Sequence, residues 1–502
     1  MSLPTISPFR ESPLADVSPP ATPPARRGAN AYFAASGAAQ IIALIRYVVL
    51  ARMLGPEQLG LTATLVVMAT FFDMVSDAGS DRFLIQDRDG DTPEVQSLVQ
   101  LFYIGRGAAT ALILAVFAWP IAMAYGTPQL TIGLALLGVS RFILGFVHLD
   151  LRRSQRHLDF RSEATALIWA EFSGLFATGL AAYLTHNYTA ILYGLTARAM
   201  VMVAVSHLRS TRPYRIGFSN EHAARLGRFA MPLMINGVLL FLATQGDRAL
   251  VGRQLGLVTL GRYSAILLLI FYPVSTITRY IQTMYLPLLA RTRDDDTERN
   301  RLANVMGGQV LLLAILMSAG FALVAPLAVT VLYGSRFSEA ASTVALIGIL
   351  QTSRFLQVYP TVVALSAGRS VGPLAVNTTR LLAYPAAFLG GLTLGGLPGV
   401  LAGFVSGELL AQAIGLIMLN RVFKRPTLDG FDRILMFILS SGVVLAIIWA
   451  FQRPGPLSQA SVAFGGCVLA GWIVHRERPA IVESVTLLRR ITRGLSPKFA
   501  RA

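Results

Sequence analysis

The sequence predicts an all-α membrane protein with about 14 transmembrane helices, arranged as two six-helix lobes followed by two C-terminal helices. Hydrophobic residues make up 54% of the 502 positions and charged residues only 14%, whereas about 25% of the residues in a soluble domain are charged. The mean hydropathy is +0.59. This composition excludes a soluble enzyme, a disordered protein and a disulfide-rich scaffold.

The formal net charge of +17 comes almost entirely from arginine, because lysine occurs only at positions 424 and 498. These basic residues stand between apolar runs, so membrane orientation explains them better than nucleic-acid binding does. The single cysteine, Cys467, allows neither an intrachain disulfide nor a cysteine metal cluster. The histidines show no metal-binding spacing, and no nucleophile motif is present. We therefore expect no catalytic residues, no metal and no cofactor.

The chain begins with a proline-rich segment at 1–29, which lacks the apolar core of a signal peptide. Such a segment is typical of a disordered tail. Apolar runs of about 20 residues then recur, each long enough for one spanning helix, and glycine–proline turns separate several of them. The runs cover residues 30–53, 58–79, 97–125, 129–150, 163–184, 188–208, 229–252, 263–289, 302–326, 339–366, 372–394, 398–420, 431–451 and 457–475.

These runs define the domain organisation that we expect. Loops between them are short, which leaves no room for a soluble catalytic domain. The expected parts are a disordered cytoplasmic tail at 1–29, an N-terminal lobe at 30–208, a basic inter-lobe loop at 209–228, a C-terminal lobe at 229–420, two additional helices at 431–475 and a basic cytoplasmic tail at 476–502.

The distribution of arginine between alternate loops predicts the orientation. Loops on one side hold most of the basic residues, from Arg152 in the N-terminal half to Arg433 near the end, whereas the opposite loops hold only Arg253, Arg262, Arg336 and Arg453. Because basic loops stay in the cytoplasm, we expect both termini to be cytoplasmic.

A short motif is repeated in the two halves of the chain. The pattern R-x-L-G-x-x-x-L-G begins at Arg52 and again at Arg253, 201 residues later. Six expected spans separate the copies, so both have the same orientation in the membrane. The pattern therefore predicts two parallel lobes related by a pseudo-two-fold axis along the membrane normal, with a central cavity between them. A chance match between two turns rich in leucine and glycine is the alternative.

Charged residues inside the expected spans suggest where a substrate binds. A charged side chain at mid-membrane costs about 2.5–3.5 kcal/mol, so these residues must face protein or a wet cavity. Arginines outnumber acids there, which favours a cationic cavity, and the guanidinium fork suits phosphate. Buried ion pairs or side chains that reach the interface are the alternative. The arginines are Arg46, Arg106, Arg141, Arg198, Arg279, Arg354 and Arg380, and the acids are Asp73, Glu171, Asp247 and Glu408.

From these we select candidate residues by role. Asp247 lies 201 residues after Arg46, so opposite charges occupy equivalent positions. They could meet across the cavity as a gate, or they could equally be unrelated. Asp73 and Asp77 lie on one helix face, where paired carboxylates could form a proton or sodium site. For Asp77 a place at the cytoplasmic interface is favoured, and for Asp73 both alternatives stay open. The substrate-binding candidates are Arg46, Arg52, Arg279, Arg354 and Arg380, and the gating or ion-coupling candidates are Asp73, Asp247 and Glu408.

Two segments carry a resemblance to a known family. Residues 45–60, from Ile45 to Gly60, resemble the first-helix signature of polysaccharide and O-antigen flippases, and residues 246–263 resemble the seventh-helix signature. These proteins belong to the multidrug/oligosaccharidyl-lipid/polysaccharide exporter superfamily. The resemblance implies a V-shaped pair of bundles in the bacterial cytoplasmic membrane that works by alternating access. Its substrate would be an oligosaccharide on undecaprenyl pyrophosphate, destined for lipopolysaccharide or exopolysaccharide.

The resemblance also bears on individual residues and partners. Related lipid II flippases carry two first-helix arginines six residues apart that are needed for transport, and Arg46 and Arg52 match this spacing. Those flippases place an acid early in the second helix, where this chain has Gly60, so lipid II itself is not expected. A polysaccharide polymerase and chain-length proteins would be partners in the same pathway.

Two other functions remain as alternatives. A multidrug exporter of the same superfamily would favour an acidic cavity for cationic drugs, which the arginine surplus disfavours. A polytopic glycosyltransferase or polymerase would need an external loop longer than the short loops between these spans.

The arginine asymmetry makes a direct prediction about topology. Reporter fusions after residues 187, 336 and 455 should read as periplasmic, and fusions after 155, 215 and 428 as cytoplasmic, because arginine-rich loops are retained inside. Alkaline phosphatase and fluorescent-protein fusions measure this. Exchange of the two sets would show that the orientation is wrong.

Overall fold

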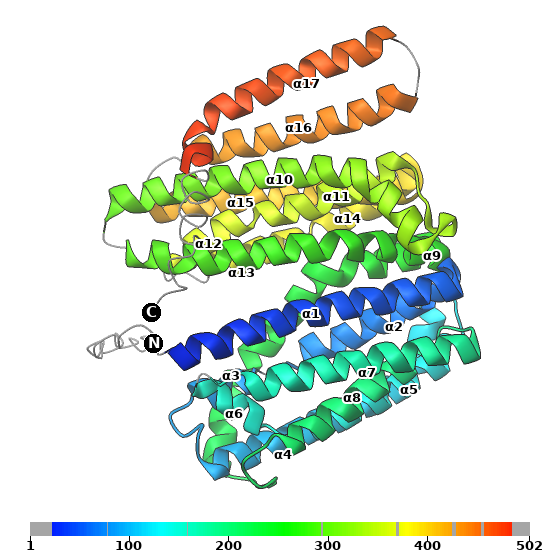
Figure 1. Ribbon diagram of the computed structural model, residues 1–502, viewed down its shortest axis with the longest axis vertical. Coiled ribbons are helices and arrows are strands. Elements are labelled where there is room, and N and C mark those ends of the chain that lie inside the picture. The colour runs from blue at the N-terminus through cyan, green and yellow to red at the C-terminus, as the bar shows by residue number, and fades with distance from the viewer. Residues whose placement is uncertain are drawn as a thin grey trace, which may run out of the picture.

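The computed structural model describes residues 23–483, except for positions 78, 158, 293–294, 368–370, 424–427 and 453–455. Residues 1–22 of the expected N-terminal tail and 484–502 of the expected C-terminal tail lie outside the described residues. Residues 23–29, which were expected to be disordered, are helical. Helices form all the regular structure of the described part, which contains no strand. They make fourteen successive crossings of one bundle (Figure 1), so the predicted fold class is confirmed.

Helices α1 to α8 form the N-terminal lobe, which occupies the lower half of Figure 1. The third and sixth helices of this lobe are short segments that continue the crossings begun by α2 and α5. The bounds are α1 Pro23–Leu54, α2 Pro56–Val75, α3 Ser80–Gln86, α4 Pro93–Ala124, α5 Leu130–Leu144, α6 Asp150–Arg156, α7 Arg161–Thr185 and α8 Ala190–Leu208.

The C-terminal lobe begins with α9, Asn220–Arg291, which is two crossings joined at Gly256, where φ is 83° and ψ is 173°. Two further helices, α16 and α17, follow this lobe, and α16 packs on the outside of α10 (Figure 1). The remaining bounds are α10 Asp296–Tyr333, η1 Ser335–Phe337, α11 Ala341–Leu356, α12 Val358–Ser366, α13 Val371–Arg380, α14 Ala383–Gly390, η2 Gly391–Gly395, α15 Gly396–Phe423, α16 Leu428–Gln452 and α17 Pro456–Arg476.

Nine stretches of the described residues are long and apolar enough to cross a membrane. Two of these, α9 and the stretch 376–420, each contain two crossings. Among the other crossings, α5 has only 15 residues, and α11 gives way to α12. Large apolar side chains such as Trp119, Phe176 and Leu323 are exposed on the outside of the bundle, as expected for a surface in contact with lipid.

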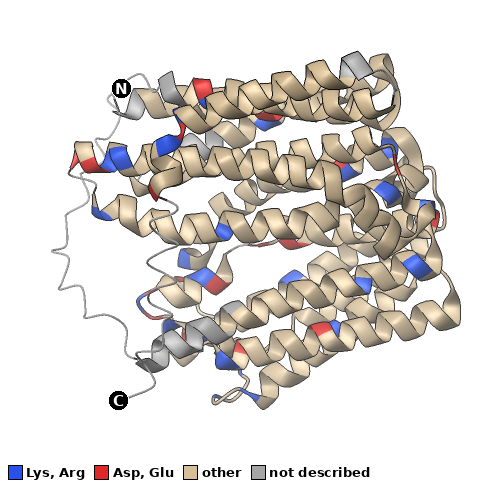
Figure 2. Cartoon of the chain, turned by 45° about the horizontal axis from the view of Figure 1, so that its top comes forward, with Lys and Arg blue, Asp and Glu red and all other residues tan. Residues whose placement is uncertain are grey.

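Charged residues lie mainly toward the two ends of the bundle, with a few at intermediate depth (Figure 2). We call the end with the start of α1 and the end of α17 the terminal end, and the other the distal end (Figure 1). One apolar core extends through both lobes and includes Leu50 and Leu65 of the first lobe and Tyr263 and Phe355 of the second.

At the distal end the two lobes meet closely where α2 crosses the second half of α9. A Cβ atom on Gly60 would lie 2.0 Å from the carbonyl oxygen of Leu257, and one on Gly261 would lie 1.9 Å from that of Pro56. Gly60 and Gly261 are equivalent positions of the repeated motif, as are Pro56 and Leu257. The contact is therefore reciprocal, so the pseudo-two-fold axis passes through it, and the motif match is not chance.

This crossing predicts that neither glycine tolerates a side chain. Gly60→Ala and Gly261→Ala should each destabilise the protein by about 1–3 kcal/mol, because the new methyl group meets a backbone carbonyl that cannot turn aside. The apparent melting temperature of the detergent-solubilised protein measures the loss.

Gly105→Ala is the matched control, because a Cβ at Gly105 would meet no atom within 4 Å. Its melting temperature should stay unchanged or rise slightly, since alanine is the better helix former. Equal melting temperatures for all three variants would contradict the close crossing.

Candidate functional site

A charged cluster lies inside the N-terminal lobe, where α1, α7 and α8 meet. Glu171 of α7 forms an ion pair with Arg46 of α1, at 3.1 Å, and accepts a hydrogen bond from Nε of Arg198 of α8, at 2.5 Å. A Cβ at Gly174 would lie 2.8 Å from Nη1 of Arg46, so this glycine leaves room for the guanidinium. Because one carboxylate serves two arginines, the cluster keeps a surplus of one positive charge.

The other two intramembrane arginines of this lobe are also accommodated. Nη1 of Arg141 donates to both carboxylate oxygens of Asp73, at 2.9 and 2.8 Å. Arg106 lies over the ring of Tyr103, 4.7 Å from its centroid, in the geometry of a cation–π contact. Asp73 is therefore neutralised by an arginine of its own lobe.

The C-terminal lobe holds a second charged cluster, formed by α9, α11, α13 and α15. Arg354 contacts Asp247 and Glu408, each at 3.0 Å, and Arg380 contacts Glu408 at 2.9 Å. The hydroxyl of Tyr263 donates to Asp247 at 2.8 Å. Two arginines face two carboxylates here, so this cluster is neutral.

The two clusters use equivalent helices with opposite charges. The first, fifth and sixth crossings carry Arg46, Glu171 and Arg198, whereas the seventh, eleventh and twelfth carry Asp247, Arg380 and Glu408. The expectation that Arg46 and Asp247 meet across a cavity is wrong for this structure, because each pairs within its own lobe. The repeated architecture thus fixes where charges occur but not their sign.

Arg248 of α9 is a buried intramembrane arginine for which the described part of the chain supplies no acidic partner, no side-chain hydrogen bond and no aromatic ring contact. Arg248 is only 8% exposed, and its Nε atom is buried without a partner. The neighbouring carboxylate of Asp247 is already committed to Arg354 and Tyr263. A buried cation without a counter-ion is unfavourable, so Arg248 is the position most in need of an anion.

Arg248 lies at the junction of the two lobes. The charge of Arg248 acts on the hydroxyl group of Tyr47 in α1. Tyr272, in the second half of α9, is within electrostatic range of Arg46, Arg248 and Glu171. The positively charged cluster of the first lobe and the unpaired arginine of the second therefore approach the same tyrosine.

Two of the predicted arginines bridge the lobes. Arg52 donates from α1 to the backbone carbonyls of Val331 and Leu332 at the end of α10, the latter at 2.7 Å. Arg279 of α9 donates to the side-chain oxygen of Gln40 in α1 at 2.8 Å. These contacts hold the lobes together in this conformation.

The structure brings together only part of the set chosen from sequence. Arg354, Arg380, Asp247 and Glu408 form one cluster. Arg46 and Arg279 have other partners, Glu171 and Gln40, and share no contact with Arg354. The binding and coupling roles of these residues, and of Arg52 and Asp73, remain predictions. No group of three or more metal-ligating side chains occurs within the described ranges.

Sequence reasoning missed Arg248. In the sequence it follows Asp247 directly, which suggests a charge neutralised by its neighbour. The structure shows that Arg354, from a helix about 100 residues later, takes that carboxylate. The sequence did contain one indication of Arg248: this residue lies within an expected span and increases the excess of arginines over acids there.

Comparison with known proteins gives a consistent result. A family model described as polysaccharide biosynthesis protein matches residues 49–342. The succinoglycan biosynthesis transport protein ExoT of Rhizobium meliloti is 26% identical over 481 residues, which are 90% of this chain and 92% of that protein.

Two solved structures share the fold. The lipid II flippase MurJ, in an inward closed conformation, has a TM-score of 0.65 at 12% identity and covers 92% of this chain and 99% of its own. An inward-facing multidrug resistance transporter of the MATE family has a TM-score of 0.61 at 14% identity, over 80% of this chain and 95% of its own. At these identities the likeness establishes the two-lobed fold alone.

Proposed function

Because the chain belongs to the polysaccharide biosynthesis protein family, we propose that it flips a lipid-linked oligosaccharide across the bacterial cytoplasmic membrane by alternating access. The carrier lipid would be undecaprenyl pyrophosphate. The name of the relative ExoT, a transport protein of succinoglycan biosynthesis, and the lipid flippase fold both support this proposal. In the proposed orientation the terminal end faces the cytoplasm, as the arginine-rich loops favour.

The unpaired charge of Arg248 is the observation that carries the proposal. A pyrophosphate headgroup that leaves water needs fixed positive charge, and charge-assisted bonds from guanidinium groups supply it. Arg248 has no competing partner, and the nearby Arg46–Glu171–Arg198 cluster adds a surplus positive charge. The headgroup therefore has two sources of positive charge, one from each lobe.

The clusters also suggest how binding is accommodated. Glu171 is shared between Arg46 and Arg198, so a pyrophosphate oxygen can replace it at Arg46 while Arg198 retains the carboxylate. No carboxylate is left without a cation in this exchange. Arg354 and Arg380 stay paired with Asp247 and Glu408, and so act in this proposal through the shape and charge of the site rather than as direct ligands.

The alternatives fit less well. A multidrug exporter of the same superfamily shares the fold, but cationic drugs would be repelled by Arg248 and by the positive cluster beside it. A polytopic glycosyltransferase or polymerase would need a long external loop, whereas the connections between the described helices are short. Such an enzyme would instead act as a partner of this protein. We therefore assign transport and no catalysis.

The proposal predicts the effect of removing each cationic residue. Arg248→Ala and Arg46→Ala should each reduce polysaccharide export by about tenfold or more, because each loses a charge-assisted bond worth about 1.5–3 kcal/mol. The lysine variants should recover only part, since lysine keeps the charge but lacks the two-pronged donor. Exported polysaccharide and inner-leaflet lipid-linked repeat units are measured in a deletion strain carrying each variant.

Arg301→Ala is the control. Arg301 is 53% exposed and pairs with Glu298 and Glu483 on the surface, where such pairs contribute little. Its export should equal that of the wild type. Normal export in the deletion strain would disprove the function, whereas normal export by Arg248→Ala at normal expression would disprove only the proposed role of Arg248.

A further inference from the structure

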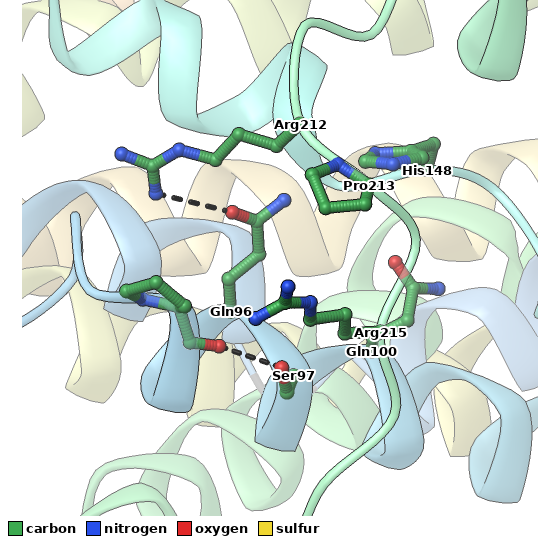
Figure 3. A pocket seen from close by; sticks show the side chains of 8 residues that line it. Gln96, Ser97, Gln100, His148, Arg212, Pro213 and Arg215 are labelled. Carbon is green, nitrogen blue, oxygen red and sulfur yellow. Dashed lines mark hydrogen bonds between the residues drawn. The ribbon is translucent and has the colours of Figure 1, made fainter.

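A small cavity lies at the terminal end of the N-terminal lobe, and none of its lining residues belongs to the charged clusters inside the two lobes (Figure 3). Its volume is about 270 Å³. It forms where the linker 209–219 between α8 and α9 passes over the first turn of α4. The side chains that matter here are Gln96, Ser97, Gln100, His148, Arg212 and Arg215.

The linker is fixed in place, so the cavity is preformed. The backbone N–H and the hydroxyl of Thr211 both donate to Asp150, at 2.7 and 2.9 Å. Arg212 donates to the carbonyl oxygen of Asp91 at 2.6 Å, and the N–H of Gly217 donates to the carbonyl oxygen of Ser97 at 3.3 Å. These bonds tie both ends of the segment that carries Arg215.

The cavity is positively charged. None of its lining residues is acidic, and the first turn of α4 adds the positive end of a helix dipole. Arg215 is exposed and forms no ion pair or hydrogen bond within the described part of the chain, and it reaches toward Gln96 and Ser97 in Figure 3. Its charge is therefore available to a ligand.

The two acids that contact residues around the cavity, Asp91 and Asp150, are already engaged, since Arg153 donates to both carboxylates. Burial raises the pKa of Asp91, but hydrogen bonds from Arg153 and His157 and the charge of Arg212 outweigh burial and hold this pKa below its ordinary value. Asp91 therefore stays ionised at neutral pH, and its charge is compensated by these partners. Arg215 has no such counter-ion.

A buried donor supplies an independent indication. His148 is 1% exposed, and its Nδ1 accepts the N–H of Asp150 at 3.1 Å. Because Nδ1 accepts, the imidazole is neutral and its proton is on Nε2. That Nε2 is buried and makes no hydrogen bond. An unsatisfied N–H in the wall of a cationic cavity indicates a site for an acceptor.

We propose that this cavity binds a phosphate group, with Arg215 as its principal cation and His148 as a neutral donor. Its volume is at the lower limit of small-molecule pockets, which favours a single phosphate over a nucleotide. The phosphate could belong to a phospholipid headgroup or to a soluble molecule, because the recognition chemistry is the same. The inference does not depend on the proposed transport function.

The test measures binding to the purified full-length protein. Inorganic phosphate is titrated at constant ionic strength, and phosphatidylglycerol is titrated into phosphatidylcholine nanodiscs, with the apparent melting temperature as readout. Wild-type protein should be stabilised by at least one probe. Arg215→Ala should weaken that response about tenfold, as expected for loss of a charge-assisted bond. A response to phosphate indicates a soluble ligand, and a response to phosphatidylglycerol alone indicates a lipid.

Two further variants complete the design. His148→Asn can keep an acceptor for the N–H of Asp150 but loses the Nε2 donor, so it should also weaken binding. Arg209→Ala is the matched control, because Arg209 is exposed on the same linker and does not line the cavity. Stabilisation of the wild type by neither probe would overturn the proposal. So would an equal loss in Arg209→Ala and Arg215→Ala, which would show diffuse attraction instead of a site.

Discussion

The need to neutralise charge inside the membrane determines how this protein is organised. An isolated charged side chain at mid-membrane costs about 2.5–3.5 kcal/mol, and each lobe pairs several of its intramembrane arginines with its own carboxylates. Glu171 serves Arg46 and Arg198 in one lobe, and Glu408 serves Arg354 and Arg380 in the other. These shared carboxylates join helices that are distant in sequence. They leave Arg248, at the junction of the lobes, as the unpaired charge.

Because the ion pairs inside the membrane lie within lobes, the lobes can move as units without separating these buried charges. Ion pairs between the lobes occur at the terminal end, where Arg225 of α9 contacts Asp87 and Asp89. The contacts that must change lie between the lobes, and include the Arg52 bonds to α10, the Arg279–Gln40 bond and the glycine crossing. These are hydrogen bonds and backbone packing, which are weaker than a buried ion pair. In the proposed cycle, opening of the distal end would release Arg52 and separate Gly60 from Leu257, while both charged clusters stay intact.

The sequence predicted the fold well because apolar runs and a repeated motif are local signals. Length and hydropathy identified the crossings, and the repeat at Arg52 and Arg253 identified the two lobes. The ion pairs between arginines and carboxylates could not be predicted, because they depend on which sides of the helices pack against each other. Arg46 was expected near Asp247 but pairs with Glu171, and Arg248 was missed because Asp247 is its neighbour in sequence.

The most direct test of this account is the structure of the protein with bound undecaprenyl pyrophosphate, determined by cryo-electron microscopy in nanodiscs. The account predicts the pyrophosphate between the lobes, at hydrogen-bond distance of about 3 Å from the guanidinium groups of Arg248 and Arg46, with Arg354 still paired to Asp247 and Glu408. A pyrophosphate bound elsewhere, with Arg248 as buried and unpaired as before, would contradict it.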